Sequence, residues 1–266
     1  MFYVSLFFKF VRIRWRSQLE YPGAFALAIL AQWMSYGFQF LTMWILVGAF
    51  GTLNHWQPMQ VLFLYAMNLF AYASGATFTF TFSREMPTLA RTGALDDVLI
   101  KPLDSFVYML SANINVGYVS HLSLAIAAMA ISLHALGIVL GPLQVLWLAV
   151  ALASGAVIHG SLMILCCVPS IFVVGDTDWG FFYWGLRDFL DYPLSIFARP
   201  LQLLFTFVLP FGFINFFPAQ AILGIQDTVG FAPAIVYLAP AVALALAGLT
   251  LWAWRGALNR YESTGS

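Results

Sequence analysis

The chain has 266 residues, of which 62% are hydrophobic and only 8% are charged. Soluble domains carry about 25% charged residues, so this composition excludes a soluble globular protein. The formal net charge at pH 7 is zero and the basic residues are spread over separate short segments, which argues against a nucleic-acid-binding protein.

Three long stretches lack charged residues almost entirely. Residues 21–83 and 105–175 contain no Asp, Glu, Lys or Arg, and residues 200–254 contain only Asp227. One helix crosses the hydrocarbon core of a bilayer with about 20 residues, so each stretch accommodates two helices and a turn. The segments are long and continuously apolar, unlike barrel strands, so the predicted fold class is all-α, a polytopic membrane protein with six transmembrane helices. The predicted spans are residues 24–47, 58–83, 106–135, 143–168, 194–217 and 232–254.

The remaining charged residues form four clusters, at residues 9–20, 84–104, 176–199 and 255–262. If three helical hairpins each leave one face and return to it, all four clusters share that face. They contain all 11 Lys and Arg residues, as four, three, two and two in chain order. The positive-inside rule then predicts that both termini are cytoplasmic.

Residues 1–20 are predicted to form an amphipathic interfacial helix along the inner leaflet. Ser5, Lys9, Arg12 and Arg16 recur at helical spacing on one face. The apolar face consists of Phe7, Phe8, Val11 and Trp15. Such a helix either anchors the chain to anionic lipid or carries force from a partner into the first span.

Residues 84–104 contain a second amphipathic element, a short helix that follows a break of the second span at Pro87. One side consists of Leu95, Val98 and Leu99, and the other of Asp96, Asp97 and Lys101. Asp97 and Lys101 have the favourable acid-before-base spacing of four, and Pro102 ends the element. The segment is longer than a joining loop requires, so it is either a docking surface or a solvated loop with incidental pairing.

The cluster at residues 176–199 contains several acids but lacks the regular ligand spacing of a calcium loop. We expect an interfacial linker anchored by Trp179, Tyr183 and Trp184. Arg187 with Asp188 or Asp191 offers a pairing site for a partner chain.

The fifth span is predicted to be kinked or broken, because prolines recur along it at positions 193, 200, 210 and 218. Broken helices commonly line a cavity or a pathway. The fifth span is therefore one candidate wall of a substrate route, and polar residues of the second span form another. The candidate lining residues are Asn68, Thr77, Gln202, Thr206, Pro210 and Asn215.

Small residues at spacings of about four mark one face of the fourth span and one of the sixth. Those of the fourth span include Ala151, Gly155 and Gly160, and those of the sixth are Ala239, Ala243 and Ala247. They form either an interface between two copies of the chain or contacts within one bundle.

No nucleotide-binding, catalytic or metal motif is present in the sequence. Its two lysines follow Phe8 and Ile100, so it has no phosphate-binding loop ending in Gly-Lys-Ser/Thr. The adjacent Cys166 and Cys167 are expected to pack rather than bridge. We expect His121 and His159 to be neutral packing residues rather than proton relays, since no acid lies near them in sequence.

Two segments resemble a known family. The segment Arg91-x-Gly93-x-Leu95-Asp96-x-x-Leu99-x-Lys101-Pro102-Leu103 is similar to the one between spans two and three of bacterial type-2 ABC transporter permeases. A proline-punctuated stretch from Tyr192-Pro193-Leu194 to Leu223-Gly224 resembles the same family. The resemblance implies that residues 84–104 are a coupling segment that rests in a groove of a separate ATPase, and that residues 218–231 form re-entrant helices on the outer side. The implied ATPase-coupling residues are Arg91, Gly93, Leu95, Asp96, Asp97, Leu99, Lys101 and Pro102.

The resemblance implies a permease subunit of an ATP-driven export system in the bacterial plasma (inner) membrane. Such a chain is not itself an enzyme and binds no cofactor, whereas its partner ATPase subunits bind ATP and Mg. A second permease copy, identical or homologous, would complete the pathway. The 26 Phe residues would suit an amphipathic cargo.

Two alternatives stay open. An ion-gradient-driven secondary transporter should carry essential charges within its spans, and no intramembrane carboxylate is evident in the sequence. A membrane scaffold would recruit a cytoplasmic partner through residues 84–104 without transport.

Overall fold

The computed structural model describes residues 2–50, 52–173 and 180–262, and in this part of the chain the regular elements are helices. The α-helices are α1 Phe2–Leu19, α2 Pro22–Phe50, α3 Pro58–Thr92, α4 Leu95–Leu99, α5 Ser105–Ala112, α6 Val119–Ala135, α7 Pro142–Cys167, α8 Gly180–Arg187, α9 Arg199–Leu203, α10 Phe216–Leu223 and α11 Ala239–Leu258. Short 3-10 or π turns lie between them at Val116–Tyr118, Val168–Ile171, Asp188–Asp191 (η3), Leu194–Ile196, Leu204–Val208 (η5), Phe211–Phe213 and Pro233–Tyr237. Five helices are long and apolar enough to cross a membrane, and one bent pair passes the same test together. The all-α membrane fold predicted from the sequence is confirmed.

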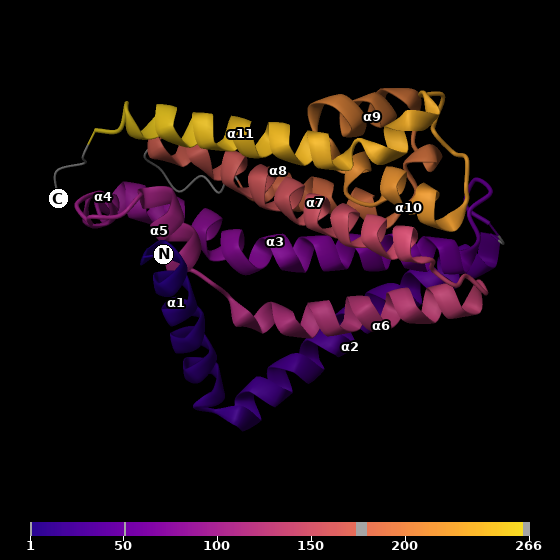
Figure 1. Cartoon of the computed structure of the whole chain (residues 1–266), viewed down its shortest axis with the longest axis horizontal. Helices are drawn as coiled ribbons and strands as arrows, with labels where there is room; N and C mark the ends of the chain where they lie inside the picture. Colours follow the sequence, from indigo (N-terminus) through magenta and orange to yellow (C-terminus); the bar gives the residue numbers. More distant parts are fainter. Residues whose placement is uncertain (1, 51, 174–179, 263–266) are drawn as a thin grey trace.

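The long helices run roughly along one axis, which gives the molecule two distinct ends (Figure 1). The start of α1, α4 and the end of α11 lie at one end, named here the charged end. The turns at residues 52–57 and 136–141 and the helix α10 lie at the other, named here the hairpin end. The helix α1 crosses this axis instead of following it, which is the arrangement expected of an interfacial helix.

The tightest packing joins α3 to α7. A Cβ atom added at Gly75 would lie 2.5 Å from the carbonyl oxygen of Ala156, and one added at Gly155 would lie 2.8 Å from the Cβ of Ala71. Membrane helices approach closely through such small residues. The small-residue face of the fourth span therefore makes contacts within one bundle, which answers the question that the sequence left open for that span.

The helix α3 does not end at residue 83, where the sequence predicted it would, but continues through Pro87 to Thr92. Phe82, Met86 and Ala90 are all buried at the charged end, on both sides of the proline. This packing offsets the backbone hydrogen bond that Pro87 cannot donate. The helix ends instead at Gly93, whose φ of 72° is the left-handed conformation that favours glycine.

The predicted third span, residues 106–135, is broken between α5 and α6. The side chain of Asn115 accepts a hydrogen bond from the backbone of Gly117, and the backbone N–H of Asn115 donates to the carbonyl of Thr77 on α3 at 2.8 Å. A local side-chain cap of this kind competes with a continuous helix. The break is thus fixed to the middle helix of the bundle.

The chain crosses the bundle between α7 and α9, earlier than predicted. Ile171 lies in the buried cluster of the charged end together with Trp254. Ser195, by contrast, accepts a hydrogen bond through its carbonyl from Asn54 in a turn of the hairpin end, at 3.1 Å. The crossing segment therefore contains α8 and η3, where the sequence predicted an interfacial linker. Asp176, Asp178 and Trp179 of that predicted linker lie outside the described residues.

The predicted fifth span, residues 194–217, is instead mostly a bent helix pair at the hairpin end. The segments 199–208 and 211–223 meet at 72°. Trp147, near the start of α7, donates to the carbonyl of Pro218, and Arg199 donates to the carbonyl of Val229. Arg199 is therefore not on the face shared by the other charged clusters. Counting gaps between charges misplaced this span because charged residues lie inside the bundle.

Candidate functional site

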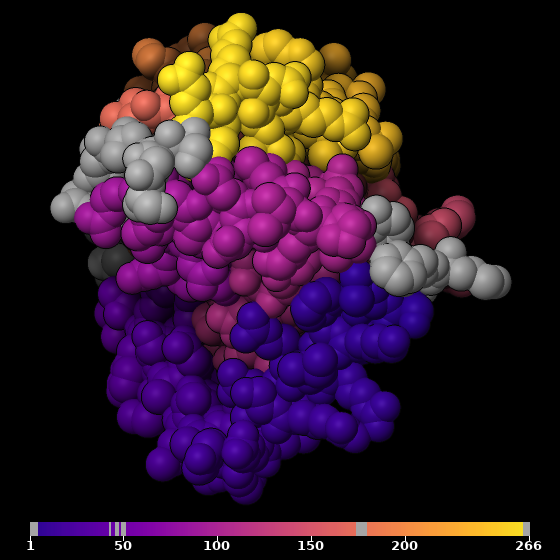
Figure 2. All heavy atoms as spheres, turned by 90° about the vertical axis from the view of Figure 1, so that its left-hand side faces the viewer, coloured from indigo at the N-terminus to yellow at the C-terminus, as the bar shows by residue number. Residues whose placement is uncertain are grey.

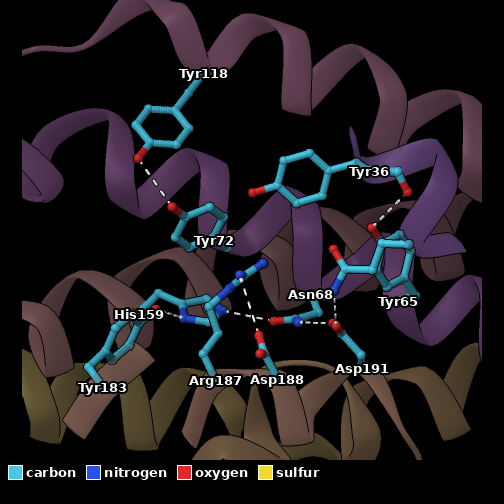
Figure 3. Close-up of polar contacts among 11 residues, drawn as sticks. Tyr36, Tyr65, Asn68, Tyr72, Tyr118, His159, Tyr183, Arg187, Asp188 and Asp191 are labelled. Atoms are coloured by element: carbon cyan, nitrogen blue, oxygen red, sulfur yellow. Dashed lines mark hydrogen bonds and ion pairs between the residues drawn. The ribbon is translucent and has the colours of Figure 1, made fainter. Parts of the chain in front are cut away.

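A continuous chain of polar side chains runs through the middle of the bundle (Figure 3). Asn68 of α3 donates through its Nδ2 to the Oδ1 of Asp191 in η3 at 2.8 Å. Its Oδ1 lies 3.0 Å from the Nε2 of His159 on α7. The Nδ1 of His159 is 2.6 Å from the hydroxyl of Tyr183 on α8, and the other Asp191 oxygen accepts from Gln39 of α2 at 2.9 Å. Five elements are joined in this way.

The hydrogen-bond directions follow from Asn68. Because its amide nitrogen donates to Asp191, its oxygen is left to face His159 and requires a donor there. The Nε2 of His159 supplies that donor, and its Nδ1 then accepts from the hydroxyl of Tyr183. A neutral imidazole therefore satisfies both ring nitrogens of His159.

Two charged side chains of the crossing segment are buried beside this polar chain. Asp191 is 4% exposed and Arg187 is 7% exposed. The guanidinium carbon of Arg187 lies 4.1 Å from the centroid of the Tyr72 ring, and its Nη1 is 3.9 Å from the Oδ1 of the exposed Asp188. No buried carboxylate was expected from the sequence, whereas Asp191 is one. Charges buried among membrane helices are costly, so they mark candidate functional positions.

A cavity of about 650 Å³, with both polar and apolar residues in its wall, lies on the other side of Tyr72, between α1, α2, α3, α6 and α8. The hydroxyls of Tyr72 and Tyr118 are 3.2 Å apart at its wall. Arg84 is the only Asp, Glu, Lys or Arg that lines it among the described residues. The full lining consists of Gln18, Phe25, Ala28, Ile29, Gln32, Tyr36, Tyr72, Phe80, Arg84, Asn115, Gly117, Tyr118, Ser120, His121 and Trp184. We name it the tyrosine cavity.

A second cavity, of about 380 Å³, lies between α2, α3 and α6 and has an almost entirely apolar wall. We name it the apolar cavity. Its lining includes Phe40, Leu41, Trp44 and Leu62. Tyr36 lines both cavities, so the two spaces adjoin. Both volumes are in the range of ~300–1,000 Å³ that is usual for small-molecule sites.

None of the six predicted pathway residues lines either cavity. Asn215 is buried and donates to the carbonyls of Leu64 and Leu190, and Asn68 belongs to the polar chain. The other four make local contacts. The hydroxyls of Thr77 and Thr206 each donate to the carbonyl four residues earlier, Gln202 donates to the carbonyl of Phe197, and the carbonyl of the buried Pro210 accepts from the backbone of Phe213. Their assignment to a pathway stays a prediction.

The cavity residues that sequence reasoning missed are mostly aromatic. Tyr36, Tyr72, Tyr118 and Trp184 lie on four different segments, so no spacing along the chain connects them. The signal available in the sequence was Arg187, four residues before Asp191, within a stretch rich in aromatic residues.

The predicted coupling segment lies at the charged end (Figures 1 and 2). Its predicted apolar side is divided: Leu95 and Val98 are buried in the cluster that also contains Trp254 of α11 and Met86 of α3. Leu99 is 37% exposed. The helix α4 ends at that residue, so Lys101 lies beyond it, with its ammonium 4.4 Å from the centroid of the Tyr108 ring.

The other predicted coupling residues surround α4. Arg91 is in the last turn of α3, Gly93 ends that helix, Asp96 and Asp97 are in the first turn of α4, and Pro102 follows it. Ile100, which the sequence analysis did not select, is 79% exposed. The exposed large apolar side chains of this segment are Leu99 and Ile100, and we name these two residues the α4 patch.

A family model described as an ABC-2 family transporter protein matches residues 33–265. The match covers most of α2 and every element from α3 to α11. No curated protein and no solved structure matches the chain.

Proposed function

The chain belongs to the ABC-2 family of transporter proteins, and from that premise we propose that it is the permease subunit of an ATP-driven export system, coupled to separate ATPase subunits. The observation that supports this most directly is the α4 patch. It presents two apolar side chains outward at the charged end, while Leu95 and Val98 lie in the buried cluster that also contains Met86 of α3 and Trp254 of α11. Movement of a bound ATPase would thus reach that cluster. ATP and Mg would be bound by the ATPase subunits.

The proposed orientation places the charged end in the cytoplasm. Three of the four charged clusters, with nine of the 11 Lys and Arg residues, belong to α1, the α3–α5 region and the end of α11. The hairpin end has Arg199, whose guanidinium lies 4.7 Å from the Phe231 ring centroid. This asymmetry matches the positive-inside rule, with both termini cytoplasmic in a bacterial inner membrane.

A second permease copy, identical or homologous, is proposed to cover α2. None of the apolar window of α2 is buried within the chain, compared with 78% of the window of α3. Its outward residues include Leu30, Met34 and Phe38, with exposed fractions of 52%, 54% and 60%. Aromatic residues and methionine are enriched at interfaces.

The test is co-purification of this chain with candidate ATPases encoded by neighbouring genes. The double variant Leu99→Glu, Ile100→Glu alters only the exposed part of the segment, whereas Leu95 is fully buried and its replacement would damage the fold. Val139→Glu, at a 91% exposed apolar residue of the hairpin end, is the matched control. We expect an ATPase to co-purify with wild type and the control but not with the double variant. Equal recovery with all three, or none with any, would contradict docking through the α4 patch.

A second candidate function is a proton-coupled carrier, because Asp191 is a buried carboxylate within a hydrogen-bonded chain. Such a carrier would transport in vesicles with a proton gradient and no nucleotide, and Asp191→Asn would abolish that transport. Transport that needs the ATPase and ATP would exclude this candidate.

A further inference from the structure

We propose that the tyrosine cavity and the apolar cavity together form one binding site for an amphiphile, with an anionic head in the first and an apolar tail in the second. The inference rests on the proposed function, because such a molecule would be the cargo of the permease. Its evidence is the chemistry of the residues that line the two cavities and the position of Tyr36, which lines both.

The tyrosine cavity suits an anionic head. Its wall offers donors from Tyr36, Tyr118 and Asn115, and Arg84 supplies a positive charge. No carboxylate lines it among the residues that the structure describes. Arg187 lies behind the wall, where its guanidinium packs on the Tyr72 ring and is paired with Asp188, so the charge at the wall itself is that of Arg84. Arginine and hydroxyl donors are the usual ligands of phosphate and carboxylate groups.

The apolar cavity suits a tail and little else. Aromatic and aliphatic side chains of α2, α3 and α6 line it, including Phe40, Trp44, Leu62 and Leu124. A free anion would leave this space empty, and a wholly apolar molecule would leave the donors of the tyrosine cavity without a partner. An unmatched buried donor costs about 1–3 kcal/mol, so a single amphiphile satisfies both spaces better than either molecule does.

Tyr36 lies at the junction and has the orientation that this arrangement needs. Its hydroxyl points towards Tyr72 and Tyr118, and its main chain lies beside Tyr65, a residue of the apolar wall (Figure 3). The carbonyl of Tyr36 accepts a hydrogen bond from the hydroxyl of Tyr65 at 3.3 Å. The polar tip of one side chain thus faces the head space, while its backbone is held beside the tail space.

The experiment uses the full-length chain in phosphatidylcholine nanodiscs and a lysophosphatidylglycerol that carries a diazirine near the end of its tail. After irradiation, cross-linked residues are mapped by mass spectrometry. We expect labels on the apolar wall, at Trp44, Met59 or Leu124. The same tail with an uncharged maltoside head should label these residues about tenfold less. The loss of one hydrogen bond to a charged group weakens binding by about that factor.

Paired variants separate the two halves of the site. Ala128→Phe fills the apolar cavity and should remove the label, whereas Ala130→Phe, on an exposed position of the same helix, should not. Arg84→Ala should reduce labelling about tenfold and Arg84→Lys should retain most of it, while Arg255→Ala, at an exposed residue outside both cavities, leaves it unchanged.

The outcomes distinguish this site from the exporter assignment. Labels scattered over outward residues and insensitive to Ala128→Phe would show ordinary lipid contact and overturn the site, even if an ATPase co-purifies. Equal labelling by the charged and uncharged heads would overturn the anionic specificity. Specific labelling without any ATPase partner would support the site and reject the exporter.

Discussion

The helices α2 and α3 are neighbours in sequence but differ completely in how they are held. Of the most apolar window of each, 78% is buried for α3 and none for α2. The helix α3 contacts α7 through glycine and alanine, whereas α2 is tied to the bundle by a few polar contacts. We name the tightly packed α3 and α7 the body and the loosely attached α2 the arm. One wall of each cavity therefore belongs to the body, and the opposite wall to the arm.

The difference has a physical origin in side-chain size. Between membrane helices there is little hydrophobic driving force, so close packing depends on small residues that let backbones approach. The inward residues of α2 are bulky, among them Tyr36, Phe40 and Trp44, and they keep the helix away from α3 and α6. The two cavities are the space that these side chains leave.

The largest effect is expected where the two regions meet, at Asp191. Asp191→Ala removes the acceptor of both Asn68 and Gln39 and leaves the buried Arg187 without a nearby buried carboxylate. We expect a loss of about 3–5 kcal/mol in the free energy of unfolding, measured by SDS titration in mixed micelles. Asp188→Ala, at a side chain that is 72% exposed, should change it by less than about 1 kcal/mol. Equal effects of the two variants would show that Asp191 does not link the arm to the body.

The next effect contrasts a glycine of the body with one of the arm. Gly75→Ala forces a Cβ atom to within 2.5 Å of the Ala156 carbonyl oxygen, so α3 and α7 must separate. We expect a loss of about 2–3 kcal/mol in the same assay. Gly37→Ala on α2 meets nothing within 4 Å and should be neutral or slightly stabilising. A tolerated Gly75→Ala would mean that the body is not close-packed.

The sequence predicted the tightly packed region well and the crossing segment badly. The spans that became α3 and α7 are apolar and begin with proline, and hydropathy identifies them. Composition could not reveal that Arg187 and Asp191 lie inside the bundle, because their partners, Tyr72 and Asn68, are more than 100 residues away in the chain. A rule that assigns every charged residue to a loop therefore fails here, because residues far away in the sequence contact the buried charged side chains.

The site was less predictable than the fold for a related reason. The cavities exist because bulky residues of α2 face α3 and α6, and a helical pattern does not show which face of a uniformly apolar helix will be turned inward. The short α4 was predicted as an element, but its division into a buried half at Leu95 and an exposed half at Leu99 depends on the position of Trp254, far along the chain.

A smaller effect tests the polar chain within the body. Tyr183→Phe removes the hydroxyl that lies 2.6 Å from the Nδ1 of His159 and leaves that buried nitrogen without its partner. We expect a loss of about 1 kcal/mol in unfolding free energy, since a single hydrogen bond between membrane helices contributes about that much to stability. Tyr237→Phe, at a residue that is 58% exposed, serves as the control and should have no measurable effect. An unchanged stability for Tyr183→Phe would contradict the hydrogen-bond directions assigned from Asn68.

The smallest effect on stability should come from the arm itself, where Trp33 donates to the carbonyl of Ser120 at 3.0 Å. Trp33→Phe removes this donor but leaves a side chain that is already 45% exposed, so the loss should be about 0.5 kcal/mol. The substitution should loosen only α2 and not the whole protein. Hydrogen exchange should accelerate in α2 and stay unchanged in α3, because the body does not depend on the arm for its packing. If exchange accelerated equally in both helices, the arm and the body would unfold as one unit, and the contrast between them would be wrong.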